Sequence, residues 1–227
     1  SNFLDSTINC TFKYQKLNKI NMKLSTLFLI LGLVSITACN KGKADFTLKG
    51  TITDDTFGTT LEGGTVQLFE VEAGSLNTSL IGESTIGADG SYSFTFPRNT
   101  VESYILSIRK ENYFDQDKSI SFSDLTIEED NIRDFSTTAM SWAKLRFITT
   151  NPIAEMHYVK QFGKQDCATC CPIEEQTLYG AQDFEIICPN DGNTVYSYNY
   201  WVIGSPGISN KSATTNVFDT VTITLNY

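Results

Sequence analysis

Residues 46–137 alternate between apolar and polar positions with the period of two that is typical of β-strands. In the segment FTLKGTITD, Phe46, Leu48 and Ile52 are separated by threonine and lysine. In SYSFTF, three aromatic residues fall on alternate positions, so all three are expected on one face of a strand. The pattern predicts strands at 46–52, 66–71, 80–86, 92–96 and 104–108, with weaker strands at 119–122 and 131–137.

The same alternation continues through the second half of the chain. The last predicted strand places Val217, Asp219, Val221, Ile223, Leu225 and Tyr227 on one face. No stretch of residues 39–227 sustains the 3.6-residue period of a helix over three turns. The second half is therefore expected to form strands at 142–150, 155–162, 182–188, 195–203 and 216–227.

These patterns predict an all-β chain with two consecutive antiparallel β-sandwich domains. The first is expected at residues 45–137 and the second at 142–227, with the boundary near residues 136–141.

An unbroken apolar run at 27–34 departs from this pattern. Lys23 precedes it and the small-residue sequence ITAC follows it, which is the order of a secretory signal peptide at residues 22–38. The run is far shorter than the roughly 20 apolar residues that a membrane-spanning helix needs. Because Cys39 directly follows Ala38, the segment resembles the lipobox of bacterial lipoproteins. This resemblance implies a diacylglyceryl group on Cys39, membrane attachment through acyl chains, and a short tether at residues 39–44.

Residues 1–21 precede the methionine of this signal. We interpret them as an upstream extension outside the natural product, or alternatively as a long basic n-region that includes Lys13, Lys16 and Lys19. Either way they are left out of the fold prediction.

Charge limits the partners of the exported chain. Residues 1–38 contain 4 of the 17 basic and 1 of the 26 acidic residues, which leaves 13 basic against 25 acidic residues and a net charge of −12. Such a surface repels nucleic acid, whose binding depends on Lys and Arg at the phosphates. It is also repelled from anionic lipid, so the acyl chains must supply the membrane attachment.

The first half resembles the carboxypeptidase regulatory-like domains, which are transthyretin-like β-sandwiches. The segments that carry the resemblance are FTLKGTITD at 46–54, LEGGTVQLFE at 61–70, STIGADGSYSF at 84–94 and YILSIRKENY at 104–113. Asn112 stands where the family usually has glycine, and Asn is the next most tolerant residue in a left-handed turn. The resemblance implies a fold but no ligand.

Four cysteines lie close together in the second half: Cys167, Cys170, Cys171 and Cys188. An exported protein meets an oxidising environment, which favours disulfides. Three pairings are possible, and the one that joins the adjacent Cys170 and Cys171 is strained. A zinc site and a redox-active CxxC motif remain as alternatives.

Other catalytic signatures are lacking in the sequence. His157 is the only histidine and lies in a predicted strand, so the chain cannot supply the histidine ligands of a zinc carboxypeptidase. The nucleophile-elbow, P-loop and dinucleotide-binding motifs are also missing. Acidic residues gather at 115–117 and 124–130 without the spacing of a calcium loop, which indicates a solvated surface.

Aromatic residues in one predicted strand form the remaining candidate site. Tyr196, Tyr198, Tyr200 and Trp201 could stack on a sugar or a peptide, or could pack within the sandwich.

Together these features predict a lipoprotein of the cell envelope without catalytic activity or cofactor, which acts as a binding or scaffolding module for an envelope protein or a glycan. An accessory role in a polymer-uptake complex, and a thiol-redox or zinc protein centred on the cysteines, are the alternatives. By resemblance to lipoprotein sorting signals, Asn40 does not encode inner-membrane retention, and residues 41–44 contain no acidic surface-export run. We therefore expect an outer-membrane lipoprotein that faces the periplasm, with surface exposure left open.

Overall fold

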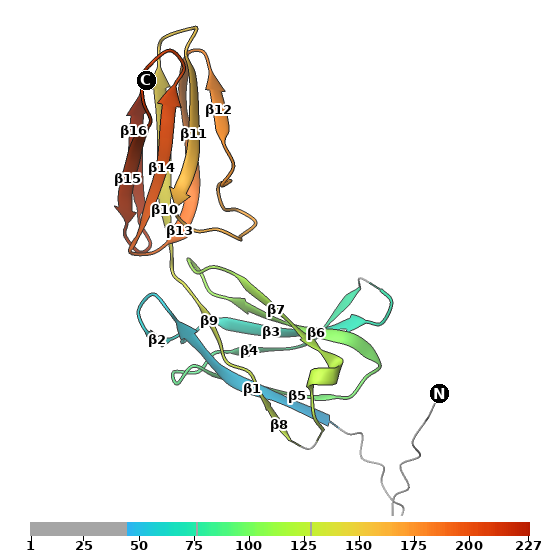
Figure 1. Cartoon of the computed structure of the whole chain (residues 1–227). Helices are drawn as coiled ribbons and strands as arrows, with labels where there is room; N and C mark the ends of the chain where they lie inside the picture. The colour runs from blue at the N-terminus through green and yellow to red at the C-terminus, as the bar shows by residue number, and fades with distance from the viewer. Residues whose placement is uncertain (1–44, 76, 128) are drawn as a thin grey trace, which may run out of the picture. The chain divides into compact units, whose positions relative to one another are not determined.

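The computed structural model describes residues 45–75, 77–127 and 129–227 (Figure 1). These residues form sixteen β-strands and one short 3-10 helix at Phe122–Asp124, so the prediction of an all-β fold is confirmed. The signal segment, Cys39 and the tether lie outside the described residues.

Two sheets make up the first sandwich. In one sheet the long strand β1 (Asp45–Asp54) pairs antiparallel with its neighbours β2 (Thr59–Thr60) and β5 (Ser91–Pro97), and parallel with β8 (Asp130–Ile132) and β9 (Phe135–Thr137). The other sheet is antiparallel, in the order β4 (Thr78–Thr85), β3 (Thr65–Glu72), β6 (Val101–Arg109) and β7 (Gln116–Ser121).

Most of the core of the first sandwich lies at the predicted alternate positions. Tyr92, Phe94 and Phe96 of β5 are all buried, as their period of two predicts. The Phe96 ring packs edge to face on Tyr104 of the facing sheet, with 4.9 Å between the ring centroids. Asn112 adopts a φ of 62°, so the left-handed turn expected at this position is present.

The second sandwich also has two sheets. A three-stranded sheet has the order β13 (Gln182–Asp191), β10 (Met140–Thr149) and β16 (Thr220–Asn226). A four-stranded antiparallel sheet has the order β12 (Gln176–Tyr179), β11 (Glu155–Phe162), β14 (Thr194–Val202) and β15 (Ser209–Thr215).

The sheets are mainly antiparallel, as predicted, but they contain parallel strand pairs in two places. In the second sandwich β10 and β16 run parallel, and in the first β1 runs parallel to β8 and β9. The alternation of apolar residues is the same for both strand directions, so the sequence pattern carries no signal that distinguishes them.

The expectation of one strand at 216–227 is also wrong. Residues 216–219 form a turn in which Phe218 has a φ of 59°, and β16 starts only at Thr220. The Asp219 amide donates to the Asn216 carbonyl at 3.1 Å, which closes the turn. In the second sandwich, two strands, β12 and β15, were not predicted, because their sequences QTLY and SNKSATT lack a clear apolar alternation.

Candidate functional site

The structure separates the four aromatic residues of β14 between two environments. Tyr196 and Tyr198 have 1% and 0% of their surface exposed and lie in the core. Tyr200 points to the same side and packs against that core, whereas Trp201 has the opposite parity and lies on the outer face of the sheet. Tyr196 and Tyr198 thus follow the alternative of packing within the sandwich, and Trp201 is the aromatic residue left for a binding role.

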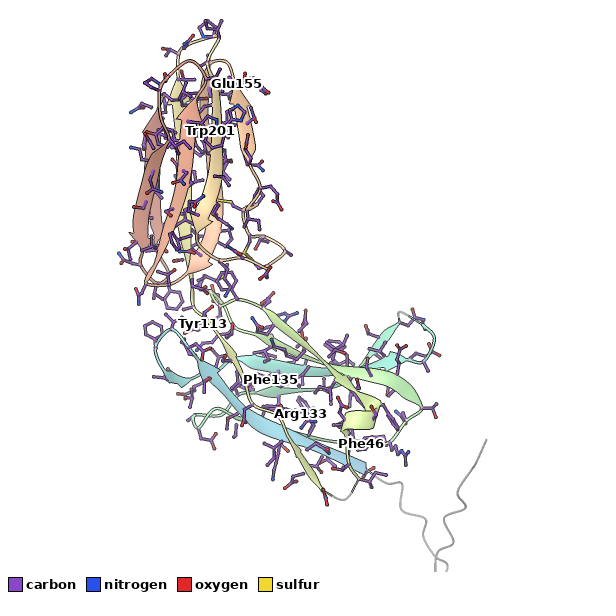
Figure 2. The ribbon with its side chains drawn as sticks, viewed as in Figure 1. Phe46, Tyr113, Arg133, Phe135, Glu155 and Trp201 are labelled. Atoms are coloured by element: carbon purple, nitrogen blue, oxygen red, sulfur yellow. A yellow bond between two sulfur atoms is a disulfide. The ribbon has the colours of Figure 1, made fainter. Side chains whose placement is uncertain are left out.

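Trp201 belongs to a row of side chains that crosses three strands. His157 of β11 is directly paired with Trp201 on one side and with Thr177 of β12 on the other. The imidazole and indole rings stack with 5.3 Å between centroids and 7° between their planes. Figure 2 shows Trp201 and Glu155 near the same end of this sandwich.

Two carboxylates hold the imidazole of His157. Its Nδ1 lies 2.6 Å from Glu175 Oε1, and its Nε2 lies 2.9 Å from Glu155 Oε1. A neutral imidazole has only one N–H group, whereas the protonated ring can donate to both carboxylates. Partial burial would lower the pKa of His157, but the hydrogen bonds and negative charges of Glu175 and Glu155 outweigh it and raise the pKa above its usual 6.5.

Two amide side chains lie on the same outer face. Asn199 precedes Trp201 by two positions in β14, and Asn210 is its partner in β15. Asn210 Nδ2 donates to Asn199 Oδ1 at 2.9 Å. We call this surface the Trp201 face; it consists of Glu155, His157, Glu175, Thr177, Asn199, Trp201 and Asn210. It combines a stacking surface with hydroxyl, amide and carboxylate groups, which suits a ligand with both apolar and hydrogen-bonding parts.

The four cysteines form two disulfides, Cys167–Cys170 and Cys171–Cys188, so the prediction of disulfides is confirmed. The pairing avoids the bridge between adjacent cysteines. Cys188 is fully buried in the core, whereas the Cys167–Cys170 bridge lies in the loop that joins β11 to β12. A sulfur atom in a disulfide has no thiolate to offer, so the alternative of a zinc site at these cysteines does not fit this structure.

A buried lysine that was not singled out from the sequence anchors this cysteine loop. Lys160 is 7% exposed, and its ammonium donates to the carbonyl oxygens of Lys164 at 2.8 Å and Cys171 at 2.5 Å. Its burial lowers the pKa of the amine. Lys160 shares the inward parity of Met156 and Tyr158, and this alternation is the signal that could have identified it.

The acidic residues of the first sandwich are partly paired. Arg109 contacts Asp115 at 3.4 Å and Asp117 at 2.7 Å, and Lys49 contacts Asp130 at 2.5 Å. Within residues 45–75, 77–127 and 129–227, no three His, Cys, Asp or Glu side chains are placed to hold a metal ion. No helix in that part of the chain is long and apolar enough to cross a membrane.

No family model and no curated protein matches the chain. Among solved structures it is similar to the TIE protein of Bacillus anthracis (12% identity, TM-score 0.36, covering 81% of this chain and 34% of the other). It is also similar to a streptococcal ancillary pilin (10% identity, TM-score 0.34, covering 81% of this chain and 63% of the other). A third similar structure is GBS52, the minor pilin of Streptococcus agalactiae (14% identity, TM-score 0.33, covering 80% of this chain and 94% of the other). The chain thus spans about a third of the first of these proteins and less than two thirds of the second. The function has to be inferred from the residues of this chain itself.

The two disulfides are expected to contribute unequally to stability. Replacing Cys171 and Cys188 with alanine opens a loop of 17 positions and should lower the free energy of unfolding by about 2–4 kcal/mol. The matched variant C167A/C170A opens a loop of only 3 positions and should lose clearly less. Urea denaturation without reductant measures both values, and equal losses would contradict the expectation.

The His157 cluster is expected to make stability depend on pH. Because the pKa is raised in the folded state, the stabilisation is fully present below about pH 6.5 and is lost as the pH rises through the raised pKa. The stability difference between the natural chain and H157Q should therefore be larger at pH 5.5 than at pH 8.5.

His157 is the only histidine, so its NMR titration is unambiguous once any affinity tag has been removed. The midpoint should lie above 6.5 in the natural chain and should fall in E175Q, which loses one of the two carboxylates. A midpoint at or below 6.5 in the natural chain would show that the carboxylates do not hold the protonated ring.

Proposed function

We propose that this chain is a non-catalytic lipoprotein of the bacterial cell envelope that binds a glycan through the Trp201 face. The observation that carries the proposal is the stacked pair of Trp201 and His157, held by Glu155 and Glu175 on the outer face of a sheet. Holding a ring in one orientation lowers the entropy cost of binding, because the surface is already arranged for the ligand.

The chemistry of the face favours a sugar over an apolar ligand. His157 covers one side of the indole, and we propose that the other side of the partly exposed Trp201 stacks on the apolar face of a sugar ring. The carboxylate and amide oxygens around it accept hydrogen bonds, which sugar hydroxyl groups donate.

Charge narrows the class of glycan further. Glu155 and Glu175 lie on this face, and residues 39–227 carry a net charge of −12. A polyanionic polysaccharide would be repelled. We therefore propose a neutral polysaccharide, or one with amino groups, as the ligand.

The anchoring part of the proposal rests on the sequence MKLSTLFLILGLVSITAC at residues 22–39. Acylation of Cys39 would tether the two sandwiches to the outer membrane on its periplasmic side. Two or three acyl chains give stable attachment, whereas one chain gives only marginal binding.

Replacing Cys39 with serine should abolish this attachment. In cells fed with an alkyne-labelled fatty acid, the natural chain should carry the label and fractionate with the outer membrane, and C39S should lack the label. Protease added to intact cells should leave the natural chain uncut while a surface-exposed control is digested. Cleavage of the natural chain would overturn the periplasmic placement but not the anchor.

Replacing Trp201 with alanine should weaken glycan binding about tenfold, which corresponds to the loss of one stacking contact. Calorimetric titration with soluble glucan, mannan and chitosan oligosaccharides measures the affinity, and acidic alginate oligosaccharides serve as the comparison ligand. The matched control V195A changes an exposed residue on the same face of β14, 46% of which is accessible, and should keep full affinity. The proposal is wrong if no glycan binds, or if V195A and W201A weaken binding equally.

A further inference from the structure

Three connections meet at one end of the second sandwich, where Figure 1 shows them together. They are the β10–β11 loop at 150–154, the β12–β13 turn at 180–181 and the β14–β15 loop at 203–208. The Gly180 amide donates to the Ala154 carbonyl at 2.7 Å, and the Ile203 amide donates to the Glu155 carbonyl at 2.8 Å. We call residues 150–154, 179–182 and 202–209 the loop end.

The loop end exposes large apolar side chains. Ile153 is 88% exposed, Ile208 is 70% exposed, Tyr179 is 64% exposed and Ile203 is 56% exposed. Ile153 lies in the β10–β11 loop, Ile203 and Ile208 lie in the β14–β15 loop, and Tyr179 is the last residue of β12. Single exposed apolar residues are common on protein surfaces, but several at one end indicate a surface that another phase or molecule covers.

The loop end is also free of charge. None of its residues is Asp, Glu, Lys, Arg or His, although the whole chain has a net charge of −9. The loop between β11 and β12, in contrast, includes Lys164, Asp166, Glu174 and Glu175. The absence of charge is therefore a property of the residues of the loop end and not of every connection in this sandwich.

We propose that the loop end inserts its exposed isoleucines into the headgroup–acyl boundary of a zwitterionic lipid bilayer. Transfer of exposed aliphatic side chains from water into an apolar phase is favourable, and no charged group has to follow them. Tyr179 suits the same boundary, where aromatic rings with a polar tip are enriched.

Charge argues for a bilayer rather than a second copy of the chain. The carboxylates of Glu155 and Asp183 flank the loop end directly in sequence. Two copies that met through their loop ends would bring these carboxylates together, at a cost in like-charge repulsion. A zwitterionic surface has no net charge and therefore causes no such repulsion. An anionic surface would add no attraction, because the loop end has no lysine or arginine.

The backbone of the loops limits the depth of insertion. Turn hydrogen bonds, such as Ser205 N to Val202 O at 3.0 Å and Ala154 N to Asn151 O at 3.2 Å, satisfy only part of the backbone groups. The remaining groups need water or lipid headgroups, because the hydrocarbon interior offers no partner. The geometry thus supports insertion of side chains only, with Glu155 and the Trp201 face left in water.

Vesicle flotation tests this proposal with the unit Lys43–Tyr227, which is compact by itself and lacks the acylated cysteine. The natural unit should float with phosphatidylcholine vesicles, and 0.5 M salt should not release it. The variant I153D/I208D should partition at least about tenfold more weakly, because it lacks two aliphatic side chains that would enter the bilayer. The matched control I187D places one new charge at an exposed position of the same sandwich, 58% of which is accessible, and should float like the natural unit.

Urea denaturation of each variant shows whether it is folded. We expect every variant to fold, because the replaced side chains lie at the surface. The proposal is overturned if the natural unit does not float, if it floats only with anionic vesicles, or if I187D is as defective as I153D/I208D. Sedimentation without lipid adds a further test: a dimer that I153D/I208D disrupts would assign the loop end to a second copy of the chain instead.

Discussion

Successive side chains of a strand must point to opposite faces of its sheet, and this constraint organises the second sandwich. In β14 it sends Tyr196, Tyr198 and Tyr200 into the core and Trp201 to the outside. In β11 it buries Met156, Tyr158 and Lys160 and leaves Glu155 and His157 on the outer face. One geometric rule therefore supplies both the packing that stabilises the sandwich and the polar face that is proposed to bind a ligand.

The burial of Lys160 connects this packing to the cysteine loop. A buried ammonium is costly unless its donors are satisfied, and here two loop carbonyls accept its hydrogen bonds. Cys171, which provides one of these carbonyls, is also joined covalently to the buried Cys188. The loop is thus tied to the core at two places, and Glu175 just beyond it is held close to His157. The position of one carboxylate of the Trp201 face depends on these attachments.

The two proposed surfaces differ in the number of charged side chains that they carry. The Trp201 face carries two carboxylates that share one imidazole, so its charge changes when His157 loses its proton. The loop end has no charged side chain, and its large apolar side chains are exposed. A polar ligand and an apolar phase can therefore be addressed by adjacent parts of the same sandwich without competing for the same residues.

The alternation of apolar and polar residues was enough to predict the all-β class, most of the strands and most of the buried positions. The reason is that alternation is a local property, and residues such as Phe94, Leu106 and Ile223 show it without reference to the rest of the chain. The expectation of disulfides likewise followed from composition and from the inferred export, although their pairing did not. Cys39 and its signal segment remain a sequence-based prediction, since they lie outside the described residues.

The identity of neighbouring strands became visible only in the folded chain, and both the Trp201 face and the loop end depend on it. His157, Glu175 and Trp201 are separated by 18 and 26 positions along the chain, and strand pairing and loop attachment bring them together. The direction of pairing between β10 and β16 and the turn at Phe218 were equally invisible, because apolar alternation is the same in parallel and antiparallel strands and does not report a positive φ. The loop end could not be predicted either, because its isoleucines lie in connections that are far apart in the sequence and come to one end of the sandwich only when the sheets have formed.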